Sequence, residues 1–449
     1  MTADVVRQAF TWIESVAVPA EGGPCWREAG EPFDDLYAGT AGVLLGCAEA
    51  TAAGASPAAG LPTEATPPVT GSGSGAEAGT VTGSGSGAEA GTVTGSGSGA
   101  GAALDRVAAG ARDRLVHLAR HEPDAATLPD DGMFGGWAGA AVALRAWGRV
   151  AADPVALDAA ASVTARVAER LRDRPVDPDR CSDVISGDAG ILLALLDAVD
   201  TGPVVEQAAH VLADGLVGLA EEHPDGPHWR MRAGDERLMP GFSHGTAGVA
   251  YALAVAGVTL RRDDLLDTAV RAADGLLAMG RQPDGWALPL LVPPRPDRPA
   301  VNFGWCHGPT GTVRLFTLLD TVDPQPRWQQ AVDGCLGALR DSGLPQRRYP
   351  GFWDNLARCC GTAGVGQLLL DRYRATADPA LLAWAHRLAG DVLARTVATP
   401  TGVAWCNTEH TRTPAELPPE PGFMQGAAGI AGWLARLAAP TTAPVLPWL

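Results

Sequence analysis

Two short motifs of this 449-residue chain place thiols just before a glycine, and one of them also contains a histidine. Cys306 is followed by His307, and the pair Cys359-Cys360 stands before another glycine. Thiolates are soft ligands that suit zinc, and a three-thiolate set leaves a fourth position open for catalysis. Cys359-Cys360 matches no common C-x-x-C pattern, so spacing alone leaves packed thiols as the competing interpretation. His307 is either a rival ligand or a hydrogen-bonded residue that orients the next helix.

A third motif of the same kind carries His244, also directly before a glycine. An imidazole suits proton transfer because it ordinarily titrates near neutral pH. Asp183 lies in the preceding motif, where a carboxylate either fixes the tautomer of His244 or caps the start of a helix. His244 with Asp183 is therefore a candidate acid/base pair.

These motifs belong to a repeat that extends along the chain. A G-x-x-G signature followed by an apolar run occurs seven times, and from the second copy onward the first glycines lie 51 to 65 residues apart. The first interval is 97 residues because an insertion intervenes. Such regular units indicate a repeat architecture. The first glycines are Gly39, Gly136, Gly187, Gly245, Gly308, Gly361 and Gly426.

Each unit contains two helix patterns. The run after each G-x-x-G is apolar nearly all round, as in a buried inner helix, and the segments between signatures repeat apolar residues at spacings of three and four, as in an outer helix. Seven such pairs closed into a ring leave no open end to cap, so we predict an all-α fold, an (α/α)7 toroid. The glycines are expected to allow sharp turns and to let the helix starts crowd at one mouth. The predicted outer helices are 5–16, 105–120, 155–172, 204–221, 263–279, 328–340 and 379–393.

If the seven signatures converge, the residues just before them face a common cavity. Units three to six then contribute the chemistry, whereas the other three units present Tyr37, Phe134 and Gln425. Convergence favours a zinc site over packed thiols. The chemically active residues are Asp183, His244, Cys306 with His307, and Cys359 with Cys360.

Residues 52–102 form a low-complexity insertion within a single predicted toroid that spans residues 1–449. The unit T-G-S-G-S-G-A-E-A-G-T-V occurs twice in full from Thr70. This stretch offers no apolar face to bury, so a flexible surface segment is predicted.

Deletion of residues 71–100 is expected to leave the melting temperature and the zinc content nearly unchanged. A Gly/Ser repeat lacks the apolar surface that would offset its ordering entropy. Calorimetry and metal analysis check this, and a large loss of either quantity would show that the insertion packs on the toroid or its mouth.

Composition limits the remaining possibilities. Apolar residues make up 46% of the chain and no apolar run approaches the roughly 20 residues of a membrane span, so a soluble globular protein is expected. The net charge of −17, with no basic stripe, argues against nucleic acid as a partner. No secretion or import signal follows Met1, so the cytoplasm is the expected location. Eight cysteines without a signal peptide point to metal or nucleophile chemistry rather than disulfides.

The motifs together resemble the lanthionine synthetase C-like family, the lanthipeptide cyclases. The resemblance rests on W-C-H-G at Trp305, C-C-G at Cys359, S-H-G-T-A-G-V at Ser243 and D-V-I-S-G at Asp183, and it covers nearly the whole chain outside the insertion. It implies the (α/α)7 toroid with zinc (Zn2+) at its mouth.

The resemblance also implies an activity. In the family, zinc binds a cysteine thiol of a modified precursor peptide, and the thiolate adds to dehydroalanine or dehydrobutyrine to form a (methyl)lanthionine thioether. The metal motifs carry over onto Cys306, Cys359 and Cys360. The acid/base pair carries over onto His244 and Asp183, with His244 protonating the enolate or helping to take the thiol proton. The implied partners are a dehydrated precursor peptide and a separate dehydratase, since the chain has no room for a dehydratase or kinase domain beside the toroid.

Two positions depart from the family pattern. Many members have Cys-His where this chain has Cys359-Cys360, so three thiolates would hold the zinc, as in a recognised subset. With a substrate thiolate the centre would carry a formal charge of −2, which favours a more nucleophilic sulfur. Asn302 stands where some cyclases have an arginine, and an amide supplies no cation for substrate positioning or enolate stabilisation.

Three other functions compete with the cyclase. The chain could instead be a relative that adds glutathione to dehydroamino acids. It could also be a zinc-stabilised scaffold that binds peptides without reacting with them. An α/α toroid glycosidase would need two carboxylates. Only Asp183 and Asp188 are acidic among the signature turns, and the three thiols would be unexplained.

Overall fold

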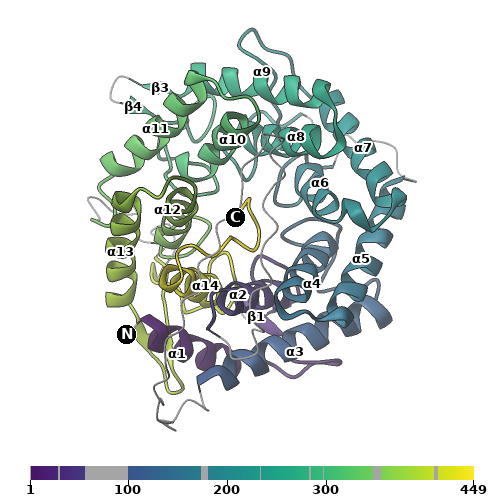
Figure 1. The fold of residues 1–449 in the computed structure, drawn as a ribbon, viewed down its shortest axis with the longest axis vertical. Coiled ribbons are helices and arrows are strands. Elements are labelled where there is room, and N and C mark those ends of the chain that lie inside the picture. Colours follow the sequence, from purple (N-terminus) through teal and green to yellow (C-terminus); the bar gives the residue numbers. More distant parts are fainter. Residues whose placement is uncertain are drawn as a thin grey trace, which may run out of the picture.

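The computed structural model describes residues 2–28, 31–55, 100–172, 180–232, 234–282, 285–296, 298–346, 355–408 and 413–449. Within these residues fourteen α-helices form two concentric rings, which confirms the predicted toroid (Figure 1). The inner helices are α2 (Thr40–Ala52), α4 (Trp137–Ala151), α6 (Asp188–Asp197), α8 (Thr246–Leu260), α10 (Pro309–Val322), α12 (Thr362–Thr376) and α14 (Ala427–Ala438). The outer helices are α1 (Thr2–Ser15), α3 (Ala100–His121), α5 (Pro154–Arg172), α7 (Pro203–Gly218), α9 (Asp263–Met279), α11 (Pro326–Asp341) and α13 (Pro379–Ala394).

The two rings differ in burial as the sequence patterns predict. The outer helix α9 buries Leu265, Ala269, Ala272 and Leu276, which recur at spacings of three and four on one face. Inner helix α8 is buried from its first residue through Leu253 and Ala254 with no polar face. The predicted helix 263–279 matches α9 in both bounds, whereas α7 ends three residues before its predicted end at 221.

The last unit packs on the first and closes the ring. Helix α14 lies against α2, where Gly46 approaches the backbone of Ala428 so closely that a Cβ at Gly46 would lie 2.8 Å from the Ala428 carbonyl oxygen. A buried ion pair joins Glu49 of α2 to Arg358 of unit six. Close backbone approach therefore defines how the first and last units meet, and a buried charge pair joins the first unit to the sixth.

Among the described residues, three short antiparallel hairpins accompany the helices. They are β1 (Trp26–Glu28) with β2 (Glu31–Phe33), β3 (Arg281–Gln282) with β4 (Gly285–Trp286), and β5 (Val397–Ala398) with β6 (Val403–Ala404). The sequence did not predict them, because strands of two or three residues are too short to show a period of two. A 3₁₀ turn, Val199–Thr201, follows α6.

The end of the chain lies inside the ring (Figure 1). Arg436 donates to the Thr442 carbonyl at 3.0 Å, and Arg314 donates to the Pro447 carbonyl at 3.0 Å. Trp305 Nε1 donates to the Trp448 carbonyl at 3.2 Å. The tail thus occupies the lumen and supports the residue that directly precedes Cys306.

Removal of residues 446–449 is expected to lower the melting temperature by several degrees. Leu446, Trp448 and Leu449 are all at least nine-tenths buried, and burial of each such side chain contributes about 1.5 to 3 kcal/mol. Thermal unfolding of the truncated and full chains measures the effect. An unchanged melting temperature would show that the tail contributes nothing to the ring.

The repeated glycines correct one expectation. The first glycine of each signature has a negative φ, from −99 at Gly39 to −159 at Gly245, so no left-handed turn is required. Glycine is needed because there is no room for a side chain. A Cβ at Gly245 would lie 1.4 Å from the Met239 carbonyl oxygen, and a Cβ at Gly311 would lie 2.0 Å from the Trp305 carbonyl oxygen. The glycines allow backbone to pack on backbone at each helix start.

Most of the predicted insertion, residues 56–99, lies outside the described residues, so its predicted flexibility stays a prediction. Helix α2 ends at Ala52 and α3 begins at Ala100, close to the predicted limits of 52–102. Of the helices described, none combines the length and the apolar character that crossing a bilayer requires.

Candidate functional site

A closed circle of backbone hydrogen bonds links the seven signature turns. Each unit donates from a residue two or three positions before its first glycine to a carbonyl of the next unit, with N···O distances between 2.8 and 3.2 Å. The last unit donates back to the first, through Met424 N and the Tyr37 carbonyl at 2.9 Å. The carbonyls that accept belong to Tyr37, Phe134, Ile185, Ser243, Cys306, Cys359 and Met424.

This circle determines where the chemically active side chains lie. Cys306 and Cys359 are members of it and are buried, each 4% exposed. The next residue is partly exposed in every turn except the first, where Ala38 is buried, and the partly exposed residues include His244, His307 and Cys360. The predicted convergence of the signatures is therefore present in the structure.

Three sulfurs from units five and six form one cluster. Cys360 Sγ lies 3.1 Å from Cys306 Sγ and 3.3 Å from Cys359 Sγ, and all three sulfurs lie within 4.8 Å of one another. None of the three is in a disulfide. Hydrogen bonds from Cys306 and Cys359 hold the pKa of Cys360 well below its usual range.

The cluster fits zinc by its chemistry. Thiolate ligands surround zinc at about 2.3 Å in a tetrahedral set, which places the sulfurs roughly 3.8 Å apart. The two closer pairs of sulfurs, at 3.1 and 3.3 Å, would need to move apart by roughly 0.5 to 0.7 Å. Neither His307, the rival ligand, nor Cys406, another partly exposed thiol, belongs to this group of described metal-ligating atoms.

His244 forms a short hydrogen bond with Asp183 across units three and four. His244 Nδ1 lies 2.6 Å from Asp183 Oδ2, and Asp183 is fully buried while the imidazole is 28% exposed. Because a carboxylate accepts, Nδ1 carries the proton and Nε2 is left as the basic atom. The other oxygen, Asp183 Oδ1, accepts from the Ser186 N–H at 2.9 Å. Asp183 thus orients the imidazole and also holds the turn before α6.

His307 and Asn302, the two other polar residues considered for this site, each contact a neighbouring residue. The His307 ring lies 5.6 Å from that of His244, and burial, with a smaller effect of His244, lowers the pKa of His307 to about 4. His307 is therefore neutral at neutral pH. Asn302 Oδ1 accepts from the Gly304 N–H at 2.7 Å, as Asn355 Oδ1 does from the Ala357 N–H at 2.8 Å. Asn302 serves the geometry of its turn.

Two residues near the cluster come from units to which the sequence assigned no chemistry. Gln425 Nε2 lies 3.8 Å from Cys360 Sγ, and the Tyr37 hydroxyl hydrogen-bonds with Cys359. Their place at the mouth was predicted, but their contacts with sulfur were not. Only their position in the repeat, equivalent to that of the cysteines, could have indicated them.

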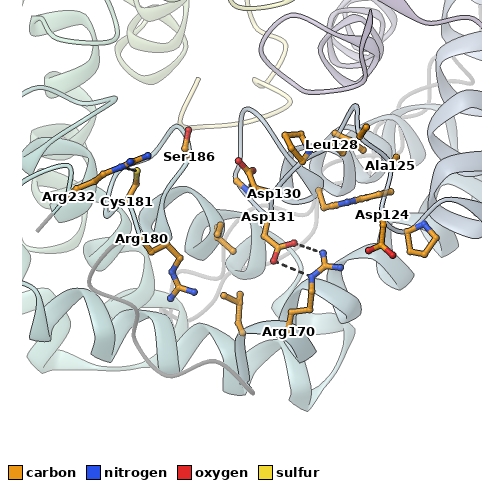
Figure 2. A pocket seen from close by; sticks show the side chains of 17 residues that line it. Asp124, Ala125, Leu128, Asp130, Asp131, Arg170, Arg180, Cys181, Ser186 and Arg232 are labelled. Atoms are coloured by element: carbon orange, nitrogen blue, oxygen red, sulfur yellow. Dashed lines mark hydrogen bonds and ion pairs between the residues drawn. The ribbon is translucent and has the colours of Figure 1, made fainter.

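A polar cavity of about 600 Å³ opens beside the turn that carries Asp183 (Figure 2). Ser186, Cys181 and Arg232 line one side of it, and Asp131 with Arg170 forms an ion pair on another side. Arg232 Nε lies 3.1 Å from Cys181 Sγ. The volume is within the range of roughly 300 to 1,000 Å³ that is usual for ligand pockets.

Comparison with known proteins agrees with this geometry. The model of the family described as lanthionine synthetase C-like protein matches residues 103–449. The solved structure of nisin cyclase is similar over 91% of this chain and 89% of that chain, with a TM-score of 0.58 and 15% identity, which shows a common fold. D-mannose isomerase is less similar, with a TM-score of 0.44, 14% identity and coverage of 68% of this chain and 85% of that chain. No curated protein matches the sequence.

Proposed function

The chain belongs to the lanthionine synthetase C-like protein family, and from this premise we propose that it is a zinc-dependent cyclase. Its substrate is a dehydrated precursor peptide in which a cysteine thiol adds to dehydroalanine or dehydrobutyrine. The observation that carries the proposal is the arrangement at one mouth of a three-thiol cluster and an oriented histidine on consecutive turns. A separate dehydratase supplies the substrate.

Cys306, Cys359 and Cys360 would hold the zinc. When bound, zinc lowers the pKa of a thiol that reaches its open position and so supplies a thiolate at neutral pH. Cys360 is partly exposed at the mouth, on the side from which a peptide arrives, whereas Cys306 and Cys359 are buried. The tail inside the ring leaves the mouth as the way in for substrate.

His244 transfers the proton during the addition. The carbon–sulfur bond forms at the β-carbon, the π electrons move toward the carbonyl as an enolate, and the α-carbon then takes a proton. The thiol proton and the α-carbon proton balance, so the reaction needs no oxidant or reductant. His244 Nε2, which Asp183 leaves unprotonated by holding the proton on Nδ1, is the atom that exchanges this proton.

The cavity beside Ser186 offers room for the peptide that flanks the reacting residues. It adjoins the Asp183 turn, and its walls carry both arginine and aspartate side chains, which suit a polar peptide better than an apolar ligand.

Mass spectrometry after thiol alkylation tests the proposal. One reaction contains a dehydrated peptide with free cysteines, and a parallel reaction contains glutathione with a dehydroamino-acid peptide. We expect loss of alkylatable thiol, without a change of peptide mass, in the first reaction. Turnover of only the second mixture would indicate a glutathione-adding relative, and turnover of neither would favour a peptide-binding scaffold.

A further inference from the structure

A chain of polar side chains ends on two of the three clustered sulfurs. Asn355 Nδ2 donates to Gln425 Oε1 at 2.8 Å, and Gln425 Nε2 donates to Tyr37 Oη at 3.1 Å. The same Nε2 lies 3.8 Å from Cys360 Sγ, and the Tyr37 hydroxyl donates to Cys359. The proposed reaction assigns no task to these polar groups.

A backbone group sets the direction of every bond in this chain. The Ala357 N–H is only a donor, and it bonds to Asn355 Oδ1 at 2.8 Å. The Asn355 amide nitrogen must therefore face Gln425, which places Gln425 Oε1 toward Asn355 and Gln425 Nε2 toward the cluster. Since the Tyr37 oxygen accepts from Gln425, its own hydrogen is free to point at sulfur.

The backbone of Gln425 is held as well as its side chain. Asn407 Nδ2 donates to the Gln425 carbonyl at 2.7 Å, and Asn407 Oδ1 accepts from the Leu356 N–H at 3.0 Å. Asn407 thus ties the turn of unit seven to that of unit six. The amide donor of Gln425 is preorganised beside Cys360 before any metal arrives.

The negative charge of a three-thiolate site explains why hydrogen-bond donors would be useful beside the sulfurs. A set of three thiolates carries one more negative charge than two thiolates with a histidine. Hydrogen bonds to the ligand atoms orient these atoms and adjust the properties of the metal centre. A hydrogen bond to an ionised acceptor is about twice as strong as one between neutral groups. An N–H and an O–H directed at sulfur would disperse part of this added charge.

We infer that Tyr37 and Gln425 are positioning residues of the metal centre, which donate hydrogen bonds to the Cys359 and Cys360 thiolates and so adapt the mouth to a three-thiolate set. The inference rests on the proposed function through its metal site. Units one and seven, which provide no ligand, thereby take part in the centre through hydrogen bonds.

Two variants remove the donors with little change of shape. Gln425→Glu keeps the oxygen that accepts from Asn355 but replaces the amide donor with a carboxylate beside the thiolates. Tyr37→Phe removes a single oxygen atom. Loss of an outer partner typically costs about 10- to 100-fold in metal affinity, so we expect zinc affinity to fall by that factor in Gln425→Glu and by roughly 10-fold in Tyr37→Phe.

The readouts are zinc affinity by competition with a chelator and the absorption spectrum of the cobalt(II)-loaded protein. Without its hydrogen bond a thiolate gives up electrons more easily, so the sulfur-to-cobalt charge-transfer band should move to lower energy in both variants. A general loss of stability would not move this band. Tyr251→Phe is the matched control, because this buried tyrosine of α8 packs against Phe242. Its affinity and spectrum should equal those of the parent.

The outcomes separate this inference from the proposed function. A parent protein that binds neither zinc nor cobalt would overturn both. A parent that binds metal, with variants that match its affinity and its spectrum, would overturn the inference alone. If Gln425→Glu fails to fold, Tyr37→Phe decides the matter, since its smaller change is compatible with the parent fold.

Discussion

Cys360→Ala is expected to abolish stoichiometric zinc binding and cyclisation together. Cys360 is the sulfur that both other thiols contact, at 3.1 and 3.3 Å, and two ligands cannot replace the set. Loss of a direct ligand should exceed the roughly 10- to 100-fold that loss of an outer partner costs in metal affinity. Elemental analysis of purified protein measures the metal, and the thioether assay measures the activity. Cys306→Ala and Cys359→Ala should behave alike.

Cys335→Ala is the matched control for this change. Cys335 is a fully buried thiol of the outer helix α11 and lies outside the sulfur cluster. The control should keep about one zinc per chain and lose only the stability that a small core truncation costs, about 1 kcal/mol. If Cys360→Ala kept one zinc with the affinity of the parent, the site would be misplaced. His307 and Cys406 would then be the ligands to test.

His244→Ala is expected to keep its zinc and to lose cyclisation rate by roughly 10²- to 10⁴-fold, the usual contribution of a positioned general acid or base. The imidazole is absent from the sulfur cluster, so ligation and proton transfer are separate tasks. The decisive measurement is the cyclisation rate of zinc-loaded variant and parent on one confirmed peptide. A variant as fast as the parent would remove His244 from the mechanism.

Asp183→Asn tests the same site by changing the tautomer of His244. The Ser186 N–H needs an acceptor, so the amide oxygen should remain there and the amide NH2 should face His244 Nδ1. Nδ1 then becomes an acceptor, and the proton moves to Nε2, the atom that must be free. The rate should fall by about 10²-fold or more with zinc retained. His386→Ala, an exposed residue of α13, is the control and should cyclise at the parent rate.

The ring could be predicted from the sequence because two independent features of the sequence show the repeat. Seven G-x-x-G signatures supply the period, and helix patterns such as that of 263–279 supply the two layers. Helix bounds were less secure at the end of α7, because Leu219 and Ala220 continue the apolar pattern beyond the last helical residue. The three hairpins were missed because each strand has only two or three residues.

Candidate residues for the mouth followed from the same repeat. The cluster of Cys306, Cys359 and Cys360 and the contact of His244 with Asp183 lie where convergence of the turns predicted them. Their roles in metal binding and proton transfer stay predictions until the variants are measured. Tyr37 and Gln425 were placed at the mouth but given no chemistry, because neither residue type indicates a metal site by itself.

The sequence by itself determined what a periodic pattern encodes: the number of units, the two layers of helices and the turns that share one mouth. Tertiary structure alone decided how atoms meet across units, since residues as distant as Tyr37 and Gln425 become neighbours only when the ring closes. It also changed the reason for the glycines, from turn conformation to space, because a carbonyl oxygen occupies the place of the Cβ only after the backbone has folded back. Periodicity is a property of one chain segment after another, whereas hydrogen-bond direction, burial and close approach depend on pairs of segments that the sequence leaves far apart.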